Sequence, residues 1–371
     1  MKIAFWGSSL VSAYWNGAAT YYRGILRALA RLGHNITFYE PDAYERQKHR
    51  DIEDPDWARV VVYDAHNAQE VAHHLKASEA SDVVVKASGV GVLDDYLESC
   101  VSRMPPSVCK LFWDVDAPAT LDRLAANLND PFHLALPRYD LVLTYGGGNP
   151  VTRRYRDIGA RQCCAIYNAF DPDVHYPVPA DNRFHCDLSF LGNRLPDRES
   201  RVDQFFFKAA ELAPERQFVL GGSGWSDKPL PANVSYLGHV YTSDHNRLNC
   251  SSRIVLNISR DSMARYGFSP ATRVFEAAGA AACIVTDSWE GIESFLQPGE
   301  EILVVNGGSE VANLVQELTP ERARSIGEAA RRRVLSEHTY ERRGLLVETI
   351  LQDAFTSFYS HTAGPRLEMH V

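Results

Sequence analysis

The stretch KIAFWGSSLVSAYWNGAATYYRGILRALARLGHNITFYEP, residues 2–41, decides the fold class. It begins with an apolar run typical of a buried strand. Residues 20–33 follow with apolar side chains at helical spacing, and Gly33 stands where a helix commonly ends. A second apolar run, NITFYEP, predicts another strand. Strand, helix and strand in this order predict a βαβ unit, which builds parallel sheets.

The same alternation continues along the chain. Apolar runs at RVVVYD, DVVVKAS, KLFWDV and DLVLTYG predict further strands, and helical stretches separate them. Such continuous apolar strands are typical of a parallel sheet covered on both faces. Prolines then break the pattern within residues 167–186, and a second α/β series begins at CDLSFLGN. We therefore predict two Rossmann-like domains, residues 1–175 and 186–340, with parallel sheets facing across a cleft. A final helix over 341–360 is expected to cross back to the first domain.

Composition supports two globular domains and excludes several classes of protein. A chain of 371 residues suits two α/β domains. The net charge of −9 argues against nonspecific nucleic-acid binding, which needs a basic surface. The start resembles no secretory signal, and no apolar stretch approaches the roughly 20 residues of a membrane span. We expect a cytoplasmic protein. Its seven scattered cysteines indicate neither a disulfide framework nor a zinc site.

Ligands of open parallel sheets bind at the carboxyl ends of the strands, so the loops there are candidate sites. In the first half, Asn16 and Gly17 follow the first strand, and Gly146 and Gly147 follow DLVLTYG. Glycines let the backbone approach a ligand closely. Both loops are equally compatible with ordinary turns, and neither carries a complete phosphate-binding motif.

In the second half, the loop after DLSFLGN presents Asn193, Arg194 and Arg198 at the start of a helix. An arginine beside a helix N-terminus suits a diphosphate, although solvated surface arginines are the alternative. His239 follows the strand VSYLG and is a candidate nucleotide contact, with an ordinary loop histidine as the alternative.

The most informative segment is NISRDSMARYGFSPATRVFEAAG, residues 257–279, which leaves a strand and enters a helix. Arg260 and Ser269 lie in its irregular part, and Arg273 and Glu276 are three residues apart on the helix. That spacing puts the last two on one helical face. They form either a simple surface pair or a site in which the cation binds phosphate and the carboxylate binds vicinal hydroxyls.

Several segments together resemble the group 1 glycosyltransferases, and within them the CgeB-like, spore-maturation-type branch. They are NGAATYYRGILRALARLGH, FWDVDAPATL, YDLVLTYGGG, IYNAFDPDVHYPV and GFSPATRVFEAAGAAACIVTDSWEGIESFLQPGEEILVV. The resemblance implies the GT-B fold and a hexosyltransferase-type enzyme without a metal or other cofactor. It also implies that the C-terminal domain holds a nucleoside diphosphate sugar and the N-terminal domain holds the acceptor.

Group 1 enzymes typically carry two glutamates separated by seven residues, of which the second binds the ribose. Glu276 matches the second position, whereas the first falls on Phe268, or on Tyr266 after a two-residue shift. The first glutamate is therefore absent, and with it the basis for predicting a retaining mechanism. The resemblance implies two diphosphate-binding cations. The first is Arg194 or Arg198, and the second is Arg260 or Arg273.

The motif DVD at residues 114–116 needs a separate interpretation, because D-x-D binds metal in the other glycosyltransferase architecture. We predict instead that Asp116 or Asp114 lies in the cleft and either positions the acceptor or acts as a general base. A metal-binding pair and a capping or turn role before Pro118 are the alternatives.

The preferred function is transfer of a sugar from a nucleoside diphosphate sugar to an unknown acceptor, which is a saccharide, a small molecule, a lipid-linked molecule or a protein. One alternative is a noncatalytic nucleotide- or sugar-binding GT-B protein, which the absent glutamate favours. Another is a nucleotide-sugar epimerase on the same scaffold, which requires acid and base groups that the sequence does not reveal.

Overall fold

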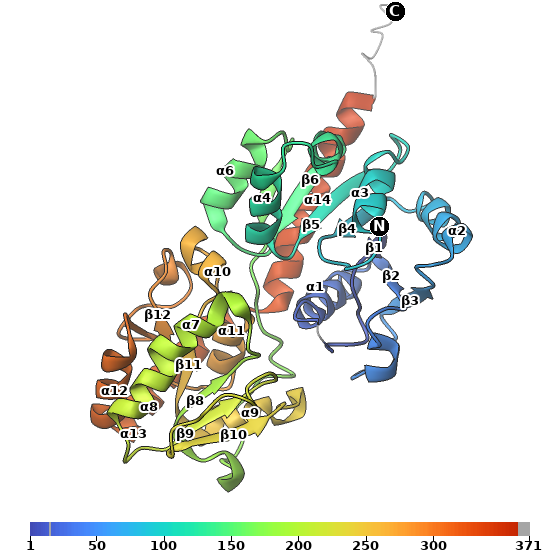
Figure 1. The fold of residues 1–371 in the computed structure, drawn as a ribbon. Coiled ribbons are helices and arrows are strands. Elements are labelled where there is room, and N and C mark those ends of the chain that lie inside the picture. The colour runs from blue at the N-terminus through green and yellow to red at the C-terminus, as the bar shows by residue number, and fades with distance from the viewer. Residues whose placement is uncertain (15, 363–371) are drawn as a thin grey trace, which may run out of the picture. The chain divides into compact units, whose positions relative to one another are not determined.

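The computed structural model describes residues 1–14 and 16–362, with side chains up to residue 355 (Figure 1). These residues form two compact units. The first comprises Met1–Tyr167 together with the segment from Tyr340 onward, and the second comprises Asn168–Thr339. Each unit contains its own parallel sheet.

The first unit has a seven-stranded parallel sheet in the order β3-β2-β1-β4-β5-β6-β7. Its strands are β1 (Lys2–Trp6), β2 (Asn35–Pro41), β3 (Ala58–Tyr63), β4 (Val83–Ala87), β5 (Cys109–Asp114), β6 (Leu141–Thr144) and β7 (Cys163–Ala165). Its helices are α1 (Ala19–Arg31), α2 (Ala68–Ser78), α3 (Asp94–Ser102), α4 (Ala117–Ala126), α5 (Phe132–Ala135), α6 (Gly148–Asp157) and α14 (Tyr340–Thr362). The predicted opening βαβ unit is thus confirmed as β1, α1 and β2.

Helix α14 packs along α1, although the two helices come from opposite ends of the chain. Two glycines make their close approach possible. A Cβ on Gly24 would lie 2.2 Å from the ring of Tyr340, and a Cβ on Gly344 would lie 2.6 Å from the Cβ of Ala28. The chain therefore needs its last described helix to complete the core of its first unit.

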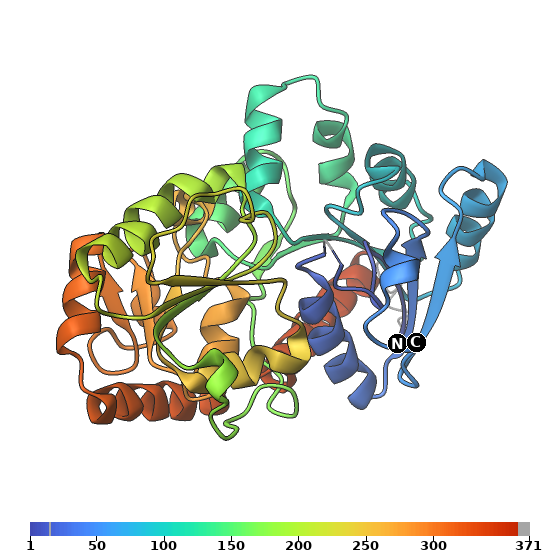
Figure 2. The ribbon, with the colours of Figure 1, turned by 60° about the horizontal axis from the view of Figure 1, so that its bottom comes forward.

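The second unit has a six-stranded parallel sheet in the order β10-β9-β8-β11-β12-β13 (Figure 2). Its strands are β8 (Cys186–Leu191), β9 (Phe218–Gly221), β10 (Val234–Gly238), β11 (Ser252–Asn257), β12 (Ile284–Asp287) and β13 (Leu303–Val305). Its helices are α7 (Pro196–Val202), α8 (Lys208–Leu212), α9 (Thr242–Ser251), α10 (Asp261–Tyr266), α11 (Thr272–Gly279), α12 (Gly308–Glu317) and α13 (Pro320–Glu337). A π-helical turn, Asp203–Phe207, joins α7 to α8 and places three phenylalanines in the core.

The predicted fold class, α/β with two parallel-sheet Rossmann-like domains, is confirmed. Two short elements are among those that differ from the prediction. Helix α10 lies where the sequence indicates an irregular loop, and β7 was not foreseen. Both are too short for apolar periodicity to reveal them.

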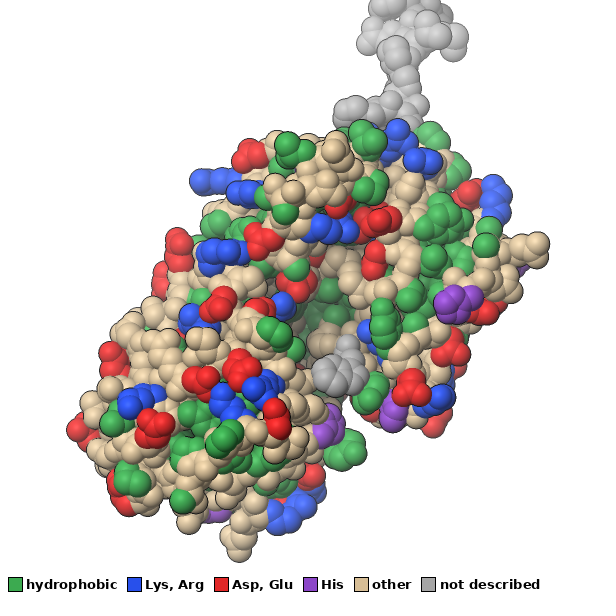
Figure 3. Space-filling view, viewed as in Figure 1, with side chains coloured by type: hydrophobic (Ala, Val, Ile, Leu, Met, Phe, Trp, Pro, Cys, Tyr) green, Lys and Arg blue, Asp and Glu red, His purple; other side chains and the backbone are tan. Residues whose placement is uncertain are grey.

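Among the helices of the described residues, none combines the length and the apolar character needed to cross a membrane. Basic and acidic side chains are interspersed on the face drawn in Figure 3.

Candidate functional site

Three arginines gather at the carboxyl edge of the second sheet, and we call them the arginine group: Arg198, Arg260 and Arg273. They follow β8 and β11, which are neighbours in the sheet. Arg198 lies on α7, Arg260 immediately precedes α10, and Arg273 lies in the first turn of α11. The sheet order therefore brings together side chains that are far apart in the sequence.

The electrostatics of the arginine group favour an anion. Burial, together with the charges of Arg273 and Arg260, lowers the pKa of Arg198 to about 10. Burial also lowers the pKa of Arg273, against the opposing effect of Glu276. Cations that depress one another's pKa gain stability when a polyanion neutralises them. The arrangement is chemically suited to a diphosphate.

The three arginines differ in how their guanidinium groups are engaged. Arg198 donates a hydrogen bond to the backbone oxygen of Asn193, and Arg260 pairs with Asp197. Arg273 forms no hydrogen bond or ion pair with any residue that the structure describes. Its charge is therefore available to a ligand.

Glu276 lies one turn after Arg273 on α11, and its side chain is only 13% exposed. Among the described residues it contacts His175, with Nε2 3.5 Å from Oε1, and Arg273 is not within ion-pair distance. The simple Arg273–Glu276 surface pair is thus not formed. The carboxylate keeps acceptor capacity for hydroxyl donors, since a carboxylate accepts about four hydrogen bonds.

Other residues predicted at this edge are engaged within the protein. Asn193 Oδ1 accepts a hydrogen bond of 2.9 Å from the Ser223 backbone, and Arg194 pairs with Glu199 at 2.7 Å and Asp227 at 2.9 Å. These contacts fasten the loop after β8 to the loop after β9. They leave Arg194 less available to a ligand than Arg273.

Two further candidates lie in the loops after β10 and β11. Ser269 is buried and donates to the Gly267 oxygen at 2.8 Å, so it shapes the loop before α11. His239 is exposed, and its ring centroid lies 4.7 Å from that of Tyr241.

A phenylalanine occupies the position where the resemblance implies the first glutamate. Phe268 has a φ of 45°, and its backbone N–H donates to the Glu290 oxygen at 2.6 Å. A Cβ on Gly291 would lie 2.2 Å from the Phe268 ring, so that glycine is needed for the ring to fit. The loop before α11 is therefore built around an apolar side chain at this point.

The two aspartates of the DVD motif have different environments in the first unit. Asp114 is fully buried and accepts hydrogen bonds from Ser88 Oγ at 2.7 Å, the Asp116 backbone at 2.9 Å and the Tyr155 hydroxyl. Burial raises its pKa. Asp116 is half-buried at the start of α4, and its side chain does not cap that helix. Of the two, Asp116 is the accessible carboxylate.

In the loop after β1, Asn16 has a clear structural role, whereas Gly17 makes no close packing contact. Asn16 Oδ1 accepts from Ser8 Oγ at 2.9 Å, while its Nδ2 donates to the Ser9 and Ser12 oxygens, which closes the loop after β1. A Cβ on Gly17 would meet no atom within 4 Å.

The loop after β6 needs Gly147 for packing. Gly147 has a φ of 82° before α6, where a Cβ would lie 2.0 Å from Val151. The Gly146 oxygen accepts from Thr144 Oγ1 at 3.1 Å.

Residues 198–352 match the sequence model of a family described as Glycosyl transferase-like. No curated protein matches the chain. Sucrose-phosphate synthase from Thermosynechococcus elongatus aligns with a TM-score of 0.70 and 15% identity, over 96% of this chain and 100% of the other. The Anabaena protein HepE, in complex with UDP and glucose, aligns with a TM-score of 0.68 and 14% identity, over 95% of this chain and 100% of HepE. An α-glucosyltransferase in complex with UDP-glucose and DNA containing an abasic site aligns with a TM-score of 0.67 and 12% identity, over 95% of this chain and 99% of the other.

The chain has the GT-B fold. At these identities the likeness concerns the fold alone, and it does not distinguish the CgeB-like branch from other branches. In this GT-B chain the arginine group, Glu276 and His239 all belong to the second unit, whereas Asp116 and the glycine loops belong to the first.

Sequence reasoning missed two histidines beside Glu276. His175 is 2% exposed, and His245 of α9 is half-buried. Burial lowers the pKa of His245 to about 4, despite the attraction of Glu276. His175 lies within the segment IYNAFDPDVHYPV, but nothing in the sequence links it to α11.

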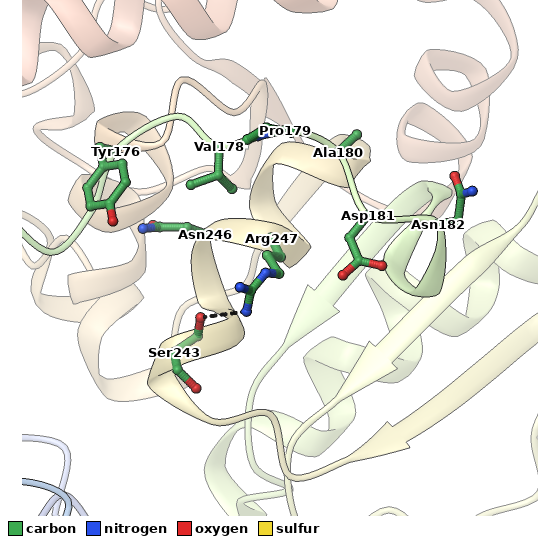
Figure 4. Close-up of a pocket in the computed structure, with 9 residues that line it drawn as sticks. All are labelled: Tyr176, Val178, Pro179, Ala180, Asp181, Asn182, Ser243, Asn246 and Arg247. Carbon is green, nitrogen blue, oxygen red and sulfur yellow. Dashed lines mark hydrogen bonds between the residues drawn. The ribbon is translucent and has the colours of Figure 1, made fainter.

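A separate cavity of about 660 Å³ lies between the segment before β8 and helix α9 (Figure 4). Tyr176 and residues 178–182 line it from one side and Ser243, Asn246 and Arg247 from the other, and Arg247 donates a hydrogen bond to the Ser243 backbone oxygen. None of the candidate site residues lines this cavity.

Within residues 1–14 and 16–362, no three or more His, Cys, Asp or Glu side chains are grouped so as to hold a metal ion.

Proposed function

We propose that this GT-B protein is a glycosyltransferase of the group 1 type, in its CgeB-like branch, that moves a hexosyl group from a nucleoside diphosphate sugar to an acceptor without a metal ion. One observation carries the proposal. The arginine group and the carboxylate of Glu276 gather at the carboxyl edge of one parallel sheet. Of these arginines, Arg273 forms no hydrogen bond or ion pair with the described residues. Cations beside an acceptor for vicinal hydroxyls match the two chemical parts of a nucleoside diphosphate.

In the proposed reaction the bond between the sugar's anomeric carbon and the diphosphate oxygen breaks, and a bond from an acceptor oxygen forms. The arginine group stabilises the negative charge that develops on the departing diphosphate. Glu276 accepts hydrogen bonds from the ribose hydroxyls. The acceptor hydroxyl loses its proton, and Asp116 is the proposed base because it is the accessible carboxylate of the DVD motif.

The donor's base is proposed from the neighbours. The titles of the HepE and α-glucosyltransferase structures name UDP or UDP-glucose. For this chain we propose a uridine diphosphate sugar as the first donor to test. We further propose a cytoplasmic protein that acts on an acceptor other than nucleic acid, in view of the net charge of −9.

Calorimetry with UDP, GDP, ADP and CDP tests the donor site, and donor hydrolysis assays then test turnover. We expect one diphosphate to bind clearly more tightly than the others and its sugar derivative to be hydrolysed or transferred. Tight binding without turnover of any donor would instead support a noncatalytic binding protein. An epimerised donor formed without an acceptor would support the epimerase. Absence of binding by all four nucleotides would refute the donor site.

A further inference from the structure

His175 is a buried side chain that the proposed chemistry does not yet use. Its side chain is 1% exposed, and neither ring nitrogen has a hydrogen-bond partner in the described part of the chain. A buried polar group without a partner costs stability, so its presence needs an explanation. Its ring contacts the Glu276 carboxylate, with Nε2 3.5 Å from Oε1.

The backbone holds His175 against α11. The His175 N–H donates to the Asp171 oxygen at 2.9 Å, which forms a turn. That turn packs on Gly279, where a Cβ would lie 2.5 Å from the Phe170 ring and 3.2 Å from the His175 oxygen. Glu276 lies three residues before Gly279, so both face the same turn. The glycine allows the approach, and the glutamate meets the imidazole.

The distance between the two groups is longer than a normal hydrogen bond, which joins nitrogen and oxygen at about 2.7–3.2 Å. Contacts in unliganded sites commonly tighten when substrate binds. An Nε2–H donor occupies one of the carboxylate's acceptor positions and leaves the rest for two hydroxyls.

We propose that His175 is a positioning residue that holds the Glu276 carboxylate toward the ribose hydroxyls of the nucleotide. The inference rests on the proposed function, because it assigns the ribose to Glu276. His175 itself does not touch the ligand. Its contribution therefore appears only with nucleotides that carry the two hydroxyls.

The test compares two probes on the full-length protein by calorimetry. They are the diphosphate among UDP, GDP, ADP and CDP that wild type binds most tightly, and its 2′,3′-dideoxy analogue. Wild type should prefer the ribose form by about tenfold or more, equivalent to at least about 1.4 kcal/mol. His175→Leu should reduce that preference several-fold by weakening the ribose form, with the dideoxy affinity unchanged. His175→Gln, which keeps an N–H donor, should restore the preference.

A double-mutant cycle separates positioning from general packing. In a Glu276→Gln background, His175→Leu should cause no further loss of preference. His175→Phe, which fills the space with an aromatic ring but lacks the donor, should behave like His175→Leu and serves in its place if the leucine variant fails to fold. Thermal unfolding of each variant reports on folding.

The outcomes distinguish this inference from the proposed function. Equal weakening of both probes by His175→Leu and His175→Phe, or an unchanged preference, would overturn the role of His175. If Glu276→Gln nevertheless abolishes the preference, the donor site stands and only His175 is misassigned. If wild type binds no nucleoside diphosphate, the proposed function and this inference both fall.

Discussion

Arg273 and Arg194 show how two arginines selected by the same reasoning acquire different environments. Both follow a strand of the second sheet and lie near a helix N-terminus. Hydrogen bonds to Glu199 and Asp227 raise the pKa of Arg194, whereas burial lowers the pKa of Arg273. Arg194 is therefore neutralised within the protein, and Arg273 keeps a charge that a ligand can use.

This difference predicts unequal effects of two matched substitutions. Arg273→Ala should weaken binding of the nucleoside diphosphate by about tenfold or more, because a hydrogen bond to a charged group is worth about 1.5–3 kcal/mol. It should change the affinity for the bare nucleoside much less. Arg194→Ala, measured by the same calorimetry, should reduce the affinity for the nucleoside diphosphate far less. Equal losses in the two variants would remove Arg273 from the diphosphate site.

Glu98 offers a second test at the scale of one residue. Its side chain is 5% exposed, and its closest charged contact is Arg123 at 3.7 Å. Burial raises the pKa of Glu98 from 4.5 to about 7. The folded chain therefore binds more protons than the unfolded chain between these two values. The contribution of Glu98 to the free energy of unfolding is fully present below about pH 4.5 and is lost as the pH rises through about 7.

Glu98→Gln mimics the protonated side chain and should remove this pH dependence. We compare the free energy of unfolding of the variant with that of wild type. The difference, variant minus wild type, should be about 2–3 kcal/mol larger at pH 8 than at pH 5. Urea unfolding of both proteins at the two pH values measures it. A relative stability that stays constant between pH 5 and pH 8 would contradict the raised pKa.

At the scale of elements, the sequence predicts most strands because buried parallel strands read as continuous apolar runs, and β4, VVVKA, is one such run. It also predicts the helix after β11 that carries Arg273 and Glu276, since position after a strand follows from the strand itself. Burial of Asp114 and the contact of His175 with Glu276 were not predictable. Both depend on packing between segments remote in sequence, which local periodicity does not encode.

The contact between α1 and α14 gives a prediction about packing. Gly24→Ala should destabilise the protein by about 1–3 kcal/mol, because its Cβ would overlap the Tyr340 ring and overpacking outweighs the gain in helix propensity. Gly17→Ala is the matched control, since a Cβ there meets no atom within 4 Å. Chemical unfolding of the three proteins gives the comparison. A Gly24→Ala protein as stable as the control would show that the two helices separate without cost.

At the scale of the whole molecule, the proposed mechanism assigns neutralisation of the diphosphate to the arginine group. Transfer or hydrolysis of the donor should therefore persist at its full rate after treatment with EDTA. The assay compares initial rates with and without the chelator, and then with Mg²⁺ or Mn²⁺ added back. If the chelator abolishes activity and either cation restores it, Asp114 and Asp116 would instead be assigned as ligands of a metal ion.

The two units also predict how the chain tolerates dissection. Every residue proposed to bind the donor lies within residues 168–339, as does His175. The two ends of this unit are joined, because the Phe170 N–H donates to the His338 oxygen at 3.1 Å and Phe170 bridges Thr339. The first unit is discontinuous, and residues 1–167 alone would expose the face of α1 that α14 covers.

We therefore expect a fragment of residues 168–339 to unfold cooperatively on heating and to bind the nucleoside diphosphate within about tenfold of the full chain, a difference of about 1.4 kcal/mol. Residues 1–167 alone should be markedly less stable. Joining them to residues 340–362 through a short glycine-serine linker should restore stability, because Arg343 Nε donates to the Tyr167 oxygen at 3.2 Å and the two ends therefore meet. Circular dichroism and calorimetry measure both properties. If the full chain binds nucleotide but the folded 168–339 fragment does not, residues outside this unit are essential to the donor site.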